Sequence, residues 1–172
     1  MNGYITNQND IFMYFEIINQ TEPSSVLDIG MFLKRIGAVS RQCMGCEIDK
    51  NIVLEGIDFM GDISAPVYNT IYNTIYGGAE DIETIIGSGA SQGKYTFVDK
   101  NYDLSFAIRP EIFLREYQEE VLWQWLGTHT KYAVTEQSAG KRVEFIQDYK
   151  NCKSCKELNV GEDTYLLIEF ER

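Results

Sequence analysis

Apolar residues at helical spacing open the chain. Ile11, Tyr14, Phe15 and Ile18 recur at intervals of three and four residues, which places them on one face of a helix. A proline follows soon after, and proline ends a helix because it lacks a backbone N–H group. The pattern predicts an N-terminal amphipathic helix over residues 8–22.

Short apolar segments, several of them rich in β-branched and aromatic residues, are typical of strands. They are 25–30, 44–49, 74–76, 102–108, 131–135, 142–146 and 164–170. A helix is predicted over 110–126, with Phe113, Tyr117, Val121 and Trp125 on one face. No helical pattern separates the last two strand segments, so we expect them to pair antiparallel.

Strand and helix patterns alternate over most of the chain. Such alternation indicates an α/β fold, in which a mostly parallel sheet is covered by helices on both faces. We therefore predict a Rossmann-like, seven-stranded sheet with a C-terminal antiparallel hairpin, and we expect ligands at the carboxyl ends of its strands. One domain, 1–172, is expected, with the helix at 8–22, a core at 24–139 and closing strands at 140–172.

The composition fits a single globular domain. The chain has 172 residues, 44% apolar and 13% aromatic, which is enough for one substantial core but not for two. Its formal net charge of −11 repels the phosphates of nucleic acids and acidic membrane surfaces, so we expect neither as a partner. No run approaches the roughly eighteen apolar residues of a membrane span, and no signal sequence is recognisable at the start. A cytoplasmic protein is predicted.

The first predicted strand carries the main candidate site. Residues 26–30 read Val-Leu-Asp-Ile-Gly, with Asp28 and Gly30 at the end of the strand. This segment resembles the opening of motif I in class I S-adenosylmethionine (SAM)-dependent methyltransferases, where a glycine turn lets the backbone approach the cofactor. The resemblance, which covers residues 25–135, implies a methyltransferase-like domain with SAM as its cofactor.

Two further acidic residues match the order of motifs in that family. Glu47 lies nineteen residues after Asp28, near the spacing of about 20 in Rossmann-like units, and resembles the acid that binds the ribose hydroxyls. Asp81, in Gly-Ala-Glu-Asp, resembles the acidic residue that meets the adenine amino group. The resemblance thus implies a cofactor site made of Asp28, Gly30, Glu47 and Asp81.

The sequence departs from the family after Gly30. The next glycine is Gly37, and bulky residues such as Phe32 and Lys34 stand where the methionine portion of the cofactor meets bare backbone in the family. Two functions therefore stay open. One is a SAM-dependent methyltransferase acting on a small molecule or a protein group, and the other is a non-catalytic binding or assembly protein with a degenerate cofactor site.

Arg109 follows the fourth predicted strand and is the candidate for substrate binding. Its guanidinium is a forked donor that could clamp a carboxylate or phosphate. The simpler alternative is a surface arginine paired with Glu111 or Glu116. The segment offers no evident general base, so no catalytic residue is identified.

Four cysteines form two Cys-x-x-Cys pairs, Cys43 with Cys46 and Cys152 with Cys155. The fold prediction separates the pairs by several strands, too far for a shared zinc ion, so no metal is predicted. The later pair is expected in a lysine-flanked loop, which would lower the thiol pKa and make this pair the more reactive one. A dithiol redox protein is therefore a third functional class. His129 is expected in a surface turn and has no second histidine with which to bind a metal.

Overall fold

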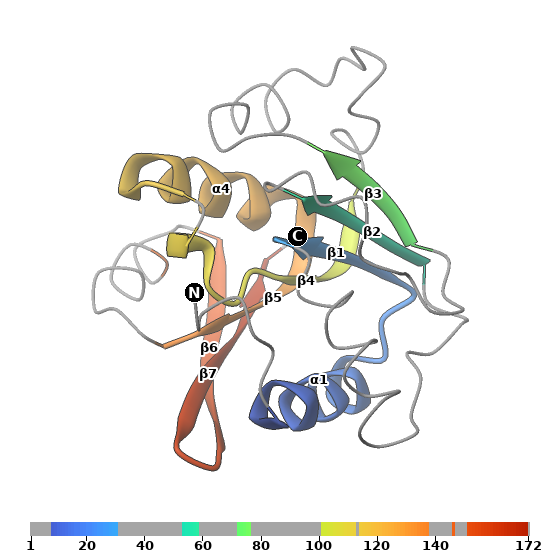
Figure 1. Ribbon diagram of the computed structural model, residues 1–172, viewed down its shortest axis with the longest axis vertical. Helices are drawn as coiled ribbons and strands as arrows, with labels where there is room; N and C mark the ends of the chain where they lie inside the picture. Colours follow the sequence, from blue (N-terminus) through green and yellow to red (C-terminus); the bar gives the residue numbers. More distant parts are fainter. Residues whose placement is uncertain are drawn as a thin grey trace.

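The computed structural model describes residues 8–30, 53–58, 72–76, 101–112, 114–137, 146 and 151–171. They build a seven-stranded sheet in the order β3-β2-β1-β4-β5-β7-β6 (Figure 1). The strands are β1 Ser25–Ile29, β2 Val53–Asp58, β3 Tyr72–Tyr76, β4 Tyr102–Phe106, β5 Thr130–Glu136, β6 Cys152–Val160 and β7 Asp163–Phe170.

The sheet has a parallel part and an antiparallel end. Strands β1 to β5 pair in parallel, whereas β7 pairs antiparallel with both β5 and β6. The chain winds outward from β1 in one direction to β2 and β3, and then returns to β1's other edge as β4. The predicted Rossmann-like α/β fold with a C-terminal hairpin is confirmed, and the point where the winding reverses lies between β1 and β4.

One described helix covers each face of the sheet (Figure 1). Helix α1, Gln8–Thr21, packs on the face that carries Val26, Leu104 and Phe106. Helix α4, Glu116–His129, packs on the opposite face. Neighbouring strand residues alternate between the two cores because side chains along a strand point to opposite faces. None of the described helices is long and apolar enough to cross a membrane.

Backbone and side-chain bonds fix the start of β1 against β4. The Asp103 carboxylate accepts the Ser24 N–H at 2.8 Å, and the Ser25 hydroxyl accepts the Asp103 N–H at 3.0 Å. These reciprocal bonds support a register in which Asp28 lies beside Phe106. The carboxyl end of β1 is therefore placed firmly next to the end of β4.

Two predicted strands were wrongly located. The strand beside β1 is Val53–Asp58, whereas the predicted segment 44–49 lies outside the described residues. The first strand of the hairpin is Cys152–Val160, not 142–146, and Ile146 is helical and buried. Strand β6 is at the edge of the sheet and partly exposed, so its sequence lacks the apolar character that identified the buried strands.

The predicted face of the second helix was also wrong. A 3-10 turn at Pro110–Ile112 precedes α4, which begins only at Glu116, so the helix does not run continuously from the proline. Tyr117 is 56% exposed, whereas Trp123 and Leu126 are fully buried. Of the predicted face, Trp125 is buried in the core. Phe113 lies outside the described residues.

His129 is the last residue of α4 and not part of a turn. Its ring stacks on that of Trp125 with centroids 4.3 Å apart, and its Nδ1 lies 3.0 Å from the Trp125 carbonyl oxygen. A histidine suits this place, since a side chain that bonds a terminal carbonyl helps to end a helix.

Candidate functional site

The carboxyl end of β1 lies at the point where the winding of the sheet reverses. Asp28 is fully buried there, and Gly30 follows the strand with a φ of 86°. A residue with a side chain adopts such a φ only with strain, so glycine suits this sharp exit from the sheet. The strand, the buried acid and the left-handed glycine form the turn that the sequence pattern predicted.

Of the four predicted cofactor residues, the structure describes these two, and Glu47 and Asp81 lie outside the described residues. The register reveals another acid at the same edge. Ile29 pairs with Ile57, so Asp58, the last residue of β2, comes beside Gly30. Sequence reasoning missed Asp58 because it placed β2 by the customary spacing. The signal was present in Val-Leu-Glu-Gly-Ile-Asp, a short segment with three apolar residues that ends in an acid.

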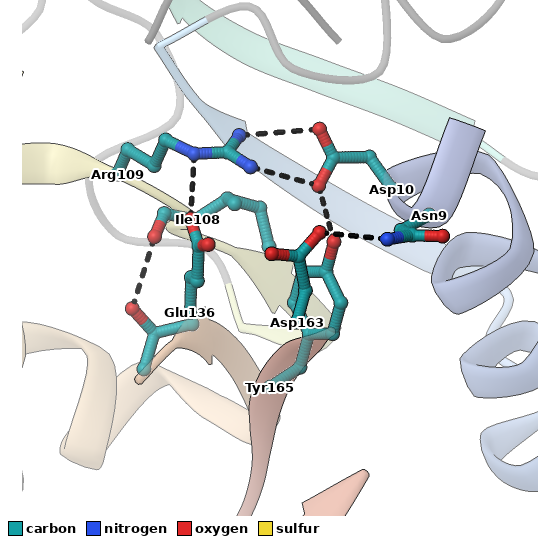
Figure 2. A network of polar contacts seen from close by, with 8 residues as sticks. Asn9, Asp10, Ile108, Arg109, Glu136, Asp163 and Tyr165 are labelled. Atoms are coloured by element: carbon teal, nitrogen blue, oxygen red, sulfur yellow. Dashed lines mark hydrogen bonds and ion pairs between the residues drawn. The ribbon is translucent and has the colours of Figure 1, made fainter. Parts of the chain in front are cut away.

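On the other side of the reversal, Arg109 follows β4 and is held by two carboxylates (Figure 2). Its Nη1 and Nη2 atoms donate to the two carboxylate oxygens of Asp10 at 3.2 and 3.0 Å. Its Nε atom lies 2.6 Å from Oε2 of Glu136. The partners therefore come from α1 and the end of β5, not from the nearby Glu111 and Glu116 that the sequence suggested.

Arg109, Asp10 and Glu136 form an ion-pair cluster, and backbone hydrogen bonds help to set its geometry. The Glu136 N–H donates to the Ile108 carbonyl at 3.1 Å, which holds the ends of β4 and β5 side by side. Asp10 lies in the first turn of α1, where the partial positive charge of the helix N-terminus favours a carboxylate. Charged side chains from α1, from the end of β5 and from the residue after the β4 segment therefore meet at one place.

A second set of bonds ties this cluster to the hairpin. The Tyr165 hydroxyl of β7 donates to Oδ1 of Asp10. Beside it, Asn9 Nδ2 donates to Asp163 at 2.9 Å (Figure 2). The hairpin turns at Gly161, whose φ is +60°, and a Cβ there would come 2.9 Å from Asn9 Nδ2. The N-terminal turn of α1 is therefore packed directly against the hairpin.

Burial shapes the electrostatics of the cluster. Asp10 is fully buried, and the side chains of Arg109 and Glu136 are each only 16% exposed. Burial lowers the pKa of Arg109, but its hydrogen bond to Asp10 and the charges of Asp10, Glu136 and Tyr165 together outweigh burial and leave that pKa raised. Burial also raises the pKa of Glu136, against the opposing effect of Arg109. Because two carboxylates already bind the guanidinium, its attraction for an external anion is reduced.

Tyr165 gives the cluster a measurable pH signature. Burial, followed by its bond to Asp10, raises the pKa of the Tyr165 hydroxyl well above its ordinary value of 10. The unfolded chain can then lose this proton above about pH 10 while the folded protein cannot, so this contribution to stability is present below pH 10 and is lost as the pH rises further.

We expect Tyr165→Phe to remove that contribution. Between about pH 10 and 11 the free energy of unfolding of the wild type should fall by up to ~1.4 kcal/mol more than that of the variant. Urea unfolding across this pH range measures the difference. Parallel curves for the two proteins would show that the folded state does not restrain ionisation of Tyr165.

The remaining predicted site residues are the two later cysteines. They lie in β6 rather than in a loop, and neither forms a disulfide. Burial raises the pKa of both thiols, so the expected lowering by neighbouring lysines is wrong. In the part of the chain that the structure describes, no three His, Cys, Asp or Glu side chains come together to hold a metal ion.

Comparisons with known proteins bear on the fold. No protein-family model matches the sequence, and no curated protein matches it. Solved structures are nevertheless similar. An O-methyltransferase from Bacillus cereus in complex with SAH (S-adenosylhomocysteine) aligns with a TM-score of 0.59 at 10% identity, covering 98% of this chain and 83% of that one.

Two further structures agree. An O-methyltransferase from Streptomyces achromogenes in complex with SAM has a TM-score of 0.61 at 11% identity, covering 98% of this chain and 82% of that one. A methyltransferase from Geobacter sulfurreducens has a TM-score of 0.63 at 10% identity, with coverage of 98% and 82%. The chain therefore has the fold of SAM-dependent methyltransferases.

Proposed function

We propose that residues 1–172 form a single SAM-dependent methyltransferase domain acting on a small molecule or a protein group. The observation that carries the proposal is the turn after β1, where the buried Asp28 and the left-handed Gly30 lie at the reversal of the sheet. In open α/β sheets this reversal is where ligands bind. The solved O-methyltransferases of the same fold with SAH or SAM bound support the same class of ligand.

The residues at this edge fit the cofactor. Gly30 has no side chain and so allows close approach to its backbone, and the buried Asp28 lies two residues before it. We assign the ribose hydroxyls to Asp58, because it ends the strand next to β1, whereas the sequence had suggested Glu47. Asp81 remains the predicted contact to the adenine. The bound cofactor would supply an electrophilic methyl group on its sulfonium centre.

The ion-pair cluster lies on the acceptor side in this proposal. Arg109 follows β4 and Glu136 ends β5, across the reversal from the proposed cofactor residues. Arg109 keeps its proposed place near the substrate, but a neutral or basic acceptor group suits it better than an anionic one because Asp10 and Glu136 balance its charge. The net charge of −11 supports an acceptor other than nucleic acid, and the proposal includes a cytoplasmic location.

A non-catalytic protein of the same fold is the second candidate. The bulky residues after Gly30, among them Phe32 and Lys34, favour it because the cofactor's methionine portion needs open backbone. The ion pairs of Arg109 with Asp10 and Glu136 also favour this candidate, because they give Arg109 a role in stabilising the fold that requires no substrate. Cofactor binding separates the two candidates, since only the enzyme requires it.

Thermal unfolding with added cofactor tests the proposal. A ligand at about 100 times its dissociation constant stabilises the folded state by roughly 2.7 kcal/mol, which raises Tm by about 5–11 °C for a chain of this length. We expect such a shift in Tm with SAM and with S-adenosylhomocysteine. Methionine, which lacks the adenosyl group, is the control and should give no shift. An unchanged Tm at millimolar concentrations of both would favour the non-catalytic protein.

A further inference from the structure

Cys152 and Cys155 are brought to the same face of the sheet by a bulge in β6. In a regular strand, residues three apart point to opposite faces. Here Cys152 pairs with Phe170, Ser154 with Glu169 and Cys155 with Ile168, so Lys153 is an extra residue on the β6 side. The bulge therefore cancels the odd spacing, and the two cysteines stand next to each other on one face.

The surroundings of the two thiols are apolar on one side and open on the other. Both cysteines are half-buried and pack against the core that includes α4 and Phe170. The two sulfur atoms are close enough to interact electrostatically, since the charge of Cys152 contributes to raising the pKa of Cys155. Strand β6 ends the sheet order, so only β7 borders it among the described strands.

We propose that Cys152 and Cys155 form a two-thiolate site for a soft monovalent metal ion, with Cu(I) as the physiological candidate. Thiolates are soft ligands and select such ions over the harder divalent cations. Zinc needs four ligands, and within the described residues no third His, Cys, Asp or Glu joins the pair. A metal ion that is stable with two ligands matches the two thiolates of Cys152 and Cys155 in β6.

The spacing favours a bridging ion over a disulfide. The cysteines are two ladder steps apart, about 6.7 Å between Cα atoms, at the upper limit for a disulfide. A disulfide must bring the sulfur atoms to about 2.05 Å, whereas a bridging ion holds each at roughly 2.3 Å and leaves them up to about 4.6 Å apart. The ion therefore needs less distortion of the strand.

Binding exchanges protons for the metal. Each thiol loses its S–H proton to solvent, and each sulfur then donates an electron pair to the ion, so one Cu(I) ion displaces two protons and leaves a bis-thiolate complex of charge −1. No electron is transferred. Because burial raises the pKa of both thiols, the pair is protonated when no metal is bound.

Silver(I) is a redox-inert probe for this site. The reduced full-length protein, mixed anaerobically with one molar equivalent of silver nitrate in chloride-free buffer, should carry one ion per chain by native mass spectrometry. Alkylation followed by peptide mapping should then find Cys152 and Cys155 protected, while Cys43 and Cys46 react as they do without silver. Protection of the earlier pair, of one thiol alone or of none would overturn the proposal.

Variants provide an independent comparison. Cys152→Ser/Cys155→Ser should lose the bound ion, and the single change Cys155→Ser should also leave Cys152 unprotected, because one thiolate cannot complete the site. The matched control Cys43→Ser/Cys46→Ser should keep one ion per chain. Loss of the ion in that control would contradict a two-residue site, and the mapping on wild-type protein decides the matter even if a serine variant fails to fold.

Discussion

Replacing Arg109 with alanine should lower the free energy of unfolding by about 3–5 kcal/mol, the cost of leaving buried charges without their partner. Asp10 is fully buried and receives both terminal nitrogens of the guanidinium, and Glu136 binds its Nε atom at 2.6 Å. Without the guanidinium, the carboxylates of Asp10 on α1 and Glu136 at the end of β5 lose the cation that lies between them. Urea denaturation at neutral pH, with an unchanged m-value, measures the loss.

An exposed ion pair supplies the control. Lys153 lies 3.3 Å from Glu169, and its side chain is 58% exposed, so Lys153→Ala should cost at most about 1 kcal/mol. Arg109→Lys should fall between the two, because lysine keeps the charge but cannot bind a carboxylate through two nitrogens. If Arg109→Ala costs no more than Lys153→Ala, the cluster does not hold α1 against the sheet.

The second large effect concerns the cofactor. Asp58→Asn should weaken SAM binding by about 10- to 150-fold, since hydrogen bonds to a charged group contribute roughly 1.5–3 kcal/mol. Asp58 ends β2 beside Gly30, where the ribose hydroxyls are expected in the proposed complex. Isothermal titration calorimetry of wild type and variant measures the ratio of the two dissociation constants.

Glu47→Gln is the matched comparison, because Glu47 was the acid that the sequence spacing indicated for the same role. We expect this change to leave the affinity almost unaltered. The opposite ranking, with Glu47→Gln the weaker binder and Asp58→Asn close to wild type, would return the ribose contact to Glu47 and would refute the assignment from the register.

The parts of the fold that were predictable from sequence are its buried strands. Strands β1, β4 and β5 lie in the middle of the sheet, and short segments rich in apolar residues identified them correctly. Strand β6 escaped prediction because an edge strand with a bulge needs no apolar pattern. Strand β2 was misplaced because the acid at its end was sought about 20 residues after Asp28. Asp58, the acid that ends β2, comes 30 residues after Asp28 (58 − 28).

The candidate site also has one part that the sequence revealed and another that it did not. Asp28 and Gly30 were found because a strand, an acid and a glycine occur together within a few residues. The ion-pair cluster was not found, since Asp10 and Arg109 are 99 residues apart and only the folded chain brings them together. A charged residue in the first turn of a helix is ordinarily a surface feature, so nothing in the sequence marked Asp10 as a buried partner.

We propose that the methyl-donor cofactor binds at the carboxyl ends of β1 and β2, beside the reversal of the sheet between β1 and β4. A crystal structure of the protein grown with saturating S-adenosylhomocysteine tests it most directly. We expect one ligand per chain at the carboxyl ends of β1 and β2, with its ribose at Asp58 and its amino-acid portion near Gly30. A protein that crystallises from that solution with this edge empty, or with the ligand bound elsewhere, would contradict the claim.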